Sequence, residues 1–410
     1  MKTINKDYIM AIDVGTTKIG VLVGHVLIDG SIDIIGIGHA PSEGLKKGVV
    51  VDIAKTVKSI KQAVQEAQLM SNTIINSAVI GISGSHIQSR NAYGAIPLEK
   101  GVVKEEDIQK VIAAARAIPL AEGQQVLHVL PQFYSVDGQD RLVDPRGMHG
   151  IRLEVQVHII TGSIASVQNL VACCETAGVA VSDIILEQLA SSYAVLTDDE
   201  RELGVGMLDI GGGTADLALY QHGTIRHTMV VPIAGNHFTN DLAIGLRTTV
   251  KEAERVKRAY GSVFDDEMRD EEFFEIETVH GQGRTSLSSF DVFEILEPRA
   301  YELLSIVHDE IINRNLQPLL VSGLVLTGGG ALLEGMKDVA QTLFDVPVRI
   351  GMPRIVHDEH SILKSPLYAT GYGLLLFAQK HTSLSAFDKD KESGVTRLLS
   401  RMKSWVSDFF

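Results

Sequence analysis

VGMLDIGGGTADLALY is the sequence of residues 205–220, and its order of residue types decides the fold. Two apolar runs flank a glycine-rich turn, a pattern that predicts a β-hairpin. Glycine lets backbone amides approach a ligand closely, and consecutive amides form a concave anion site. Asp209 and Asp216, at the ends of the turn, would repel a bare phosphate, and a bridging Mg²⁺ would complement them. An ordinary hairpin turn is the alternative, because glycine-rich turns are common.

The same pattern occurs near the N-terminus. Residues 13–18, DVGTTK, lie between the apolar runs 9–12 and 19–23. Two such hairpins about 200 residues apart indicate an internal duplication. A third glycine turn, TGGGA at residues 327–331, follows the apolar run 324–326. It predicts a strand, a turn and a helix start, where backbone amides can meet a nucleotide.

Composition bounds the class of protein. The 410 residues allow two or three domains, and the formal net charge of −14 argues against nucleic acid as a partner. The neighbouring Cys173 and Cys174 cannot form a disulfide framework or a zinc site by themselves, so we expect core packing. The N-terminus lacks the apolar core of a signal peptide, and no run approaches the ~20 apolar residues of a membrane span. A cytoplasmic protein is predicted.

The pattern along the chain predicts two α/β halves and an insertion. Asp52 is expected to cap a helix, and a buried strand follows at residues 78–83. From residue 84 the pattern changes: a helix is expected from residue 104 to before Pro119, and residues 125–136 and 151–161 alternate apolar and polar positions. Residues 84–161 are therefore predicted to form a small α+β domain of one helix and about three strands. In the second half, the acidic residues 265–277 predict a solvated face or loop, and a long helix is expected over residues 298–315.

The C-terminal end changes character twice. Residues 380–394 are polar and predict a flexible linker. In residues 395–410 apolar side chains recur at helical spacing with basic residues between them, which predicts an amphipathic helix on a bilayer surface. A helix docked on its own chain or on a partner is the alternative. The residues expected at the membrane are Arg397, Leu398, Leu399, Arg401, Met402, Lys403, Trp405, Val406, Phe409 and Phe410.

The three glycine turns resemble the phosphate-one, phosphate-two and adenosine motifs of the actin-like ATPase superfamily. The insertion, the tail and the local sequences GISG (81–84) and LEQLASS (186–192) are similar to the bacterial FtsA family over residues 1–410. The resemblance implies an α/β, duplicated actin-like (ribonuclease H-like) fold. It implies that the first half, subdomain 1A, covers residues 1–83 and 162–199, and that the inserted subdomain 1C at 84–161 mediates self-interaction. The second half, at 200–379, would contain subdomains 2A and 2B, with 2B at about 236–300. The linker 380–394 and the amphipathic helix 395–410 would follow.

The resemblance also implies roles for single residues. Mg²⁺ would be met by Asp13 and Asp209, and Glu187 would orient the attacking water with Asp209 beside it. Gln188 stands where relatives often have proline, so ATP or ADP binding is better supported than hydrolysis. The phosphates would be lined by Gly15, Thr16, Thr17, Lys18, Gly211, Gly212, Gly213 and Thr214. The adenosine would be contacted by Glu254, Lys257, Gly328, Gly329 and Gly330.

The function implied by the FtsA resemblance is a membrane-tethering, actin-like protein of cell division, at most a weak ATPase whose nucleotide is a switch. It would polymerise through the insertion, bind the C-terminal peptide of FtsZ, recruit later divisome proteins and act at the septum, on the cytoplasmic face of the inner membrane. An actin-fold kinase of small molecules is the alternative. A nucleotide-gated scaffold that scarcely hydrolyses ATP is another. A chaperone ATPase is disfavoured, because no substrate-binding domain follows Phe377.

Overall fold

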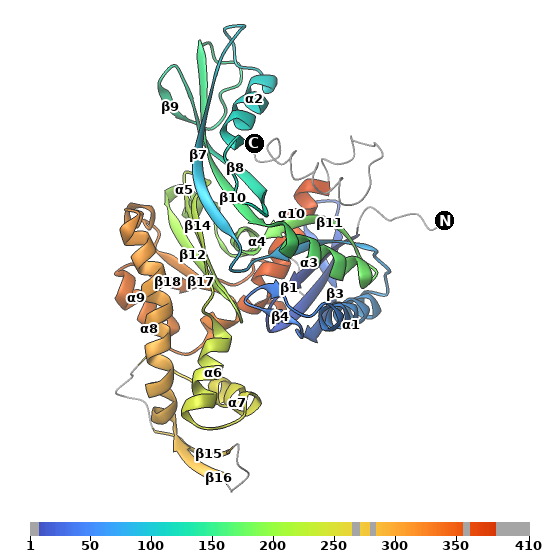
Figure 1. Ribbon diagram of the computed structural model, residues 1–410, viewed down its shortest axis with the longest axis vertical. Coiled ribbons are helices and arrows are strands. Elements are labelled where there is room, and N and C mark those ends of the chain that lie inside the picture. Colours follow the sequence, from blue (N-terminus) through green and yellow to red (C-terminus); the bar gives the residue numbers. More distant parts are fainter. Residues whose placement is uncertain (1–7, 265–270, 279–283, 356–360, 383–410) are drawn as a thin grey trace.

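The computed structural model describes residues 8–264, 271–278, 284–355 and 361–382. These residues form two five-stranded sheets, a four-stranded sheet and two two-stranded sheets. In Figure 1 the two five-stranded sheets lie at the centre and the four-stranded sheet projects from one end. The hairpin of β15 (Phe273–Glu277) and β16 (Arg284–Ser288) lies at the other end.

The first five-stranded sheet has the order β11-β6-β1-β2-β3. Its strands are β1 (Tyr8–Val14), β2 (Lys18–Val26), β3 (Ile32–Pro41), β6 (Ser77–Ile82) and β11 (Ala180–Leu186). β2 is antiparallel to both β1 and β3, whereas β6 runs parallel to both β1 and β11. β1 is buried along most of its length, which explains its almost continuous apolar sequence.

Four helices pack on or beside this sheet: α1 (Ile53–Ser71), α3 (Ile164–Thr176), α4 (Glu187–Val195) and α10 (Ala369–Thr382). The Asp52 side chain accepts a hydrogen bond from the Lys55 amide at 3.1 Å and caps α1, as predicted. Cys173 and Cys174 of α3 are free and buried, so the predicted core packing is confirmed. The short β4 (Leu45–Lys46) and β5 (Val49–Val50) form a separate hairpin.

The second five-stranded sheet repeats the topology of the first. Its order is β14-β13-β12-β17-β18, with three antiparallel neighbours followed by two parallel strands. The strands are β12 (Val205–Ile210), β13 (Ala215–Gln221), β14 (Thr224–Val231), β17 (Leu324–Thr327) and β18 (Val348–Ile350). The hairpin β12–β13 therefore occupies the place that β1–β2 has in the first sheet. The predicted duplication is confirmed.

The helices of the second half are α5 (Asp198–Leu203), α6 (Gly235–Gly245), α7 (Val250–Tyr260), α8 (Ser289–Asn313) and α9 (Met336–Phe344). The predicted long helix is present, but its predicted start is wrong. α8 begins nine residues before Pro298, since Ser288 and Asp291 form a capping box and the helix continues through the proline. Part of the acidic stretch is the strand β15, not a loop. Its Phe274 and Ile276 are buried, while Glu275 and Glu277 lie on the solvated face that was predicted.

Residues 84–161 fold largely around their own core. They contain β7 (Gln88–Pro97), α2 (Glu105–Arg116), β8 (Gln124–Val136), β9 (Gln139–Leu142) and most of β10 (Arg152–Ser163). The sheet order is β7-β10-β8-β9, and α2 contributes Ile108, Val111 and Ile112 to the core. There are four strands rather than about three, because β9 is short and mostly polar and exposed, so it shows no alternation.

Residues 380–382 continue α10, so the helix extends three residues into the predicted linker. The predicted amphipathic helix 395–410, with all ten of its membrane residues, lies outside the described residues. No helix in the described part of the chain is long and apolar enough to cross a membrane.

Candidate functional site

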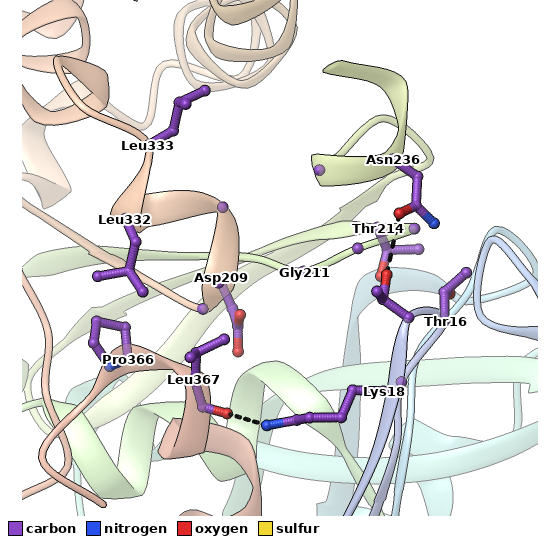
Figure 2. Close-up of a pocket in the computed structure, with 18 of the residues that line it drawn as sticks. Thr16, Lys18, Asp209, Gly211, Thr214, Asn236, Leu332, Leu333, Pro366 and Leu367 are labelled. Carbon is purple, nitrogen blue, oxygen red and sulfur yellow. Dashed lines mark hydrogen bonds between the residues drawn. The ribbon is translucent and has the colours of Figure 1, made fainter. Parts of the chain in front are cut away.

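A cavity of about 690 Å³ lies between the two halves (Figure 2). Its volume is within the range of small-molecule sites. The structure brings together on its wall every nucleotide, metal and catalytic residue predicted within the described chain. These residues are Asp13, Gly15, Thr16, Thr17, Lys18, Glu187, Asp209, Gly211, Gly212, Gly213, Thr214, Glu254, Lys257, Gly328, Gly329 and Gly330.

The hairpins β1–β2 and β12–β13, which carry the two phosphate motifs and are called the first and second phosphate hairpins below, meet in this cavity. A Cβ atom added to Gly212 would lie 1.8 Å from Thr17 Oγ1, and one added to Gly213 would lie 2.3 Å from Thr16 Oγ1. Only glycine permits this approach. Asn236 lies at the start of α6. Its side-chain Oδ1 accepts a hydrogen bond from the Thr17 hydroxyl at 3.1 Å, and its backbone N–H donates to the Gly212 carbonyl at 2.8 Å. The first turn of α6 is therefore hydrogen-bonded to the turns of both phosphate hairpins.

Four carboxyl groups are concentrated at the base of the cavity. Burial raises the pKa of Asp13 to about 6, opposed by Lys18 and increased by Asp209. Burial raises the pKa of Asp216 to about 7, although a hydrogen bond from Ser83 opposes the rise. The pKa of Glu187 is well above its usual value through burial and the nearby Asp13, Asp216 and Asp209. Lys18 and the hydrogen bonds offset this acidity only in part, so a bound cation would stabilise the charged carboxylates further.

The donor set fits Mg²⁺ held partly through water and phosphate. Carboxylate oxygens are its preferred protein ligands, and Mg²⁺ usually keeps several waters beside one or two carboxylates. Among the residues that the structure describes, no three His, Cys, Asp or Glu side chains are grouped closely enough to hold a metal ion by themselves. Phosphate and water oxygens would therefore complete the coordination.

Hydroxyl groups fix the two aspartates of the second hairpin. Ser191 donates to Asp209 Oδ2 at 2.5 Å and Thr370 donates to the same oxygen at 3.2 Å. Ser83 donates to Asp216 Oδ1 at 2.5 Å. None of the three hydroxyl residues was among the predicted site residues. Ser83 and Ser191 lie in the sequences GISG and LEQLASS, whose resemblance to the FtsA family assigns neither serine a role in the site.

Lys18 is held at the edge of the cavity. Its Nζ lies 4.5 Å from the centre of the Tyr368 ring and donates to the Leu367 carbonyl at 3.5 Å (Figure 2). The Tyr368 hydroxyl is 2.8 Å from His39 Nε2, which ties this arrangement to β3. A cation over an aromatic ring is stabilised by the ring quadrupole. Lys18 is thus oriented by the turn Pro366–Tyr368 that precedes α10, a contact that sequence spacing does not reveal.

Other residues of the cavity wall suit a nucleoside. Glu254 and Lys257 of α7 form a 2.7 Å ion pair, and Lys257 also donates to the Gly235 carbonyl at 3.0 Å. The exposed apolar side chains Leu332 and Leu367 also line the cavity (Figure 2). These leucines were not predicted. An apolar wall beside a few fixed polar groups is the usual composition of a ligand site.

Two duplicated α/β halves enclose one cavity that is lined by three glycine turns. This arrangement is the actin-like ATPase fold. Solved structures agree. The PilM-PilN type IV pilus biogenesis complex matches with a TM-score of 0.67 at 17% identity, over 90% of this chain and 98% of that one. MreB5 of Spiroplasma citri bound to ADP matches with a TM-score of 0.57 at 16% identity, over 93% and 99%.

The chain belongs to the FtsA family of cell division proteins. The family model described as cell division protein FtsA matches residues 206–373, and the model of the SHS2 domain inserted in FtsA matches residues 84–161. Cell division protein FtsA of Pseudomonas aeruginosa is 42% identical over 98% of each chain. That of Escherichia coli K12 is 37% identical over 100% of each. The chain is therefore a cell division protein of actin-like fold.

Proposed function

We propose that this chain binds Mg–ATP in the cleft and uses it as a switch for assembly at the membrane. The observation that carries the proposal is the contact between Gly212 and Thr17, which closes two phosphate hairpins over one acidic cavity. Nucleotides occupy related folds, since MreB5 structures contain ADP or AMPPNP. Because the chain belongs to a family of division proteins, we do not propose the small-molecule kinase alternative.

Each predicted residue has a place in this proposal. Asp13 and Asp209 would hold Mg²⁺ or its waters, and the ion would neutralise phosphate charge. The amides of the two glycine turns and the Lys18 ammonium would bind the phosphates. Glu254 and Lys257 would meet the ribose side of the nucleotide, with the turn at residues 328–330 beside the base.

Hydrolysis would be slow in this site. Burial and the neighbouring Asp13, Asp216 and Asp209 raise the pKa of Glu187 well above its usual value, which suits a carboxyl group that positions the attacking water. We expect Glu187→Gln to bind Mg–ATP within about 3-fold of the parent but to hydrolyse it at least tenfold more slowly in single turnover. Equal rates in parent and variant would contradict a role in hydrolysis and favour a scaffold that scarcely turns over ATP.

The wider role proposed is a link between the division polymer and the membrane. Residues 84–161 would make contacts between copies in a filament. The second half, including subdomain 2B at about 236–300, would bind the C-terminal peptide of FtsZ. The helix 395–410 would lie on the cytoplasmic face of the inner membrane, after the linker 380–394. Later divisome proteins would be recruited to this assembly at the septum.

Deleting residues 395–410 is expected to release the protein from anionic liposomes, because the apolar face of the predicted helix is then absent. Co-sedimentation measures release, and Mg–ATP titration checks that the cleft remains functional. Trp405→Glu should lower the bound fraction severalfold, whereas Ser407→Glu adds the same charge on the polar side of the predicted helix and should change it little. Unchanged co-sedimentation of the deletion variant would refute the tail assignment.

The assembly step is tested on a lipid monolayer imaged with ATP or with ADP. We expect filaments on the monolayer that depend on which nucleotide is present. Identical filaments in both nucleotides would show that nucleotide is not the switch. Absence of filaments under every condition would contradict polymerisation by this chain.

A further inference from the structure

The inserted subdomain, residues 84–161, begins next to the second phosphate hairpin. Ser83 directly follows β6 and precedes the insertion. Its hydroxyl donates to Asp216 Oδ1 at 2.5 Å and lies 3.4 Å from Thr214 Oγ1. Ser83 and Asp216 are both 3% exposed, so this contact between the two halves is shielded from water. A buried hydrogen bond to a carboxyl group is among the stronger ones in proteins.

The first phosphate hairpin is connected to the start of the insertion through Gly48. The Gly48 amide donates to Thr16 Oγ1 at 3.0 Å. A Cβ atom added to Gly48 would lie 2.7 Å from Gly84 Cα, so these two backbones are in close contact. Gly84 has a φ of +135°, a conformation that favours glycine. The first phosphate hairpin is therefore linked to Gly84 through Gly48, and the second is bonded to Ser83, the residue before Gly84.

A histidine of the insertion contacts the strand that leads to Glu187. His128 of β8 is 1% exposed, and its Nε2 accepts the Leu186 amide hydrogen at 3.2 Å. Burial lowers the pKa of His128 to about 3, so the neutral ring can accept this bond. Leu186 ends the edge strand β11 and immediately precedes Glu187 on the cavity wall. His128 thereby fixes the junction of β11 and α4.

The insertion is also attached to the second half, at the edge strand β14. Ser89 donates to the Thr228 carbonyl at 2.8 Å, and Gln132 donates to the Ile225 carbonyl at 2.8 Å. His158 Nε2 lies 2.9 Å from Thr228 Oγ1. The inserted subdomain thus contacts β11 of the first half and β14 of the second, the edge strands of the two central sheets.

We propose that Ser83 and His128 are positioning residues that couple the orientation of the inserted subdomain to the occupancy of the nucleotide cleft. This inference rests on the proposed nucleotide site. A nucleotide that draws the two hairpins together acts on Asp216 and on the Leu186–Glu187 junction. Asp216 is bonded to Ser83, the residue before the insertion, and Leu186 is bonded to His128 within it. Coupling of this kind is reciprocal, so a partner that binds the insertion changes nucleotide affinity by the same factor.

Hydrogen exchange measured on the full chain, with and without Mg–ATP, tests this coupling. In the parent, Mg–ATP should slow exchange in peptides covering residues 88–97 and 124–136 by about 5-fold or more, the lower end of typical coupling. These segments do not line the cavity. His128→Leu should lose this distant protection but keep protection of residues 9–23 and 205–220. Ser83→Ala also removes a bond to Asp216, so it is compared at a Mg–ATP concentration that restores hairpin protection, where it should still lose the distant protection. His128→Gln should retain it, because the amide oxygen can accept the Leu186 hydrogen.

Each other outcome has a distinct meaning. Protected hairpins with an unprotected insertion in the parent would overturn the coupling, as would equal protection in parent and variants. Protection of the insertion that grows with protein concentration would report contacts between copies and would also overturn it. Absence of protection at the hairpins themselves would refute the nucleotide site, a result separate from failure of the coupling. If His128→Leu does not fold, the comparison of Ser83→Ala with the parent decides the result.

Discussion

Gly212→Ala is expected to lower the affinity for Mg–ATP by at least about 100-fold, equivalent to about 2.7 kcal/mol. The added Cβ atom would lie 1.8 Å from Thr17 Oγ1 and 2.9 Å from Thr17 Cβ. Rotation of the threonine can relieve only the first contact, so the two hairpins must separate. Separation moves the amides of one turn away from phosphates held by the other. Fluorescence titration with a labelled ATP measures the change.

Gly20→Ala is the matched control for this variant. Gly20 lies in β2 of the first hairpin, and an added Cβ atom would make only ordinary contacts of 3.8 Å with Lys18 Cε and 3.9 Å with Asp13 Cβ. We expect its ATP affinity to stay within about 3-fold of the parent. An affinity of Gly212→Ala equal to that of Gly20→Ala would contradict closure of the two hairpins on one nucleotide.

Asp216→Asn is expected to change stability and ligand binding in opposite directions. The folded-state pKa of Asp216 is raised from 3.8 to about 7, so folding becomes less favourable as pH rises between these values. Asparagine removes this cost and keeps an oxygen for the Ser83 hydroxyl. Above pH 7 the ligand-free variant should gain on the order of 2–4 kcal/mol, or about 2–5 °C in Tm. The gain should shrink as pH falls toward 5.5.

The same substitution should weaken Mg–ATP binding by more than about tenfold, because a negative charge that offsets the cation is lost. Thermal unfolding from pH 5.5 to 8.5 and Mg–ATP titration measure the two effects. Asp140→Asn, at an exposed position on β9, is the control and should alter neither. A lower Tm for Asp216→Asn than for the parent at pH 8 would show that the Asp216 charge is stabilising, contrary to this account.

Most of the cleft could be predicted from local sequence. Asp13 and Asp209 each end a buried strand before a glycine turn, and this repeated order of residue types indicated the duplication that the two sheets confirm. Glycine in the second hairpin turn indicates a close approach to the first, because a Cβ atom at Gly212 or Gly213 would collide with Thr17 or Thr16. That is why the structure brings the three motifs to one cavity as expected.

The remaining contacts depend on tertiary packing. Tyr368 and Leu367 orient Lys18 from about 350 positions away, and no spacing rule links them. His128 lies in an apolar strand pattern, where a histidine gives no indication of its partner. The start of α8 was missed because Pro298 usually marks a helix boundary, whereas here the capping box at Ser288 sets it.

Isothermal titration of Mg–ATP into the full-length chain tests the central claim most directly. The account predicts saturable binding at one site per chain, lost when Mg²⁺ is chelated and lost in Gly212→Ala. Absence of saturable binding, or equal affinity in the parent and Gly212→Ala, would contradict a nucleotide site closed by the two hairpins.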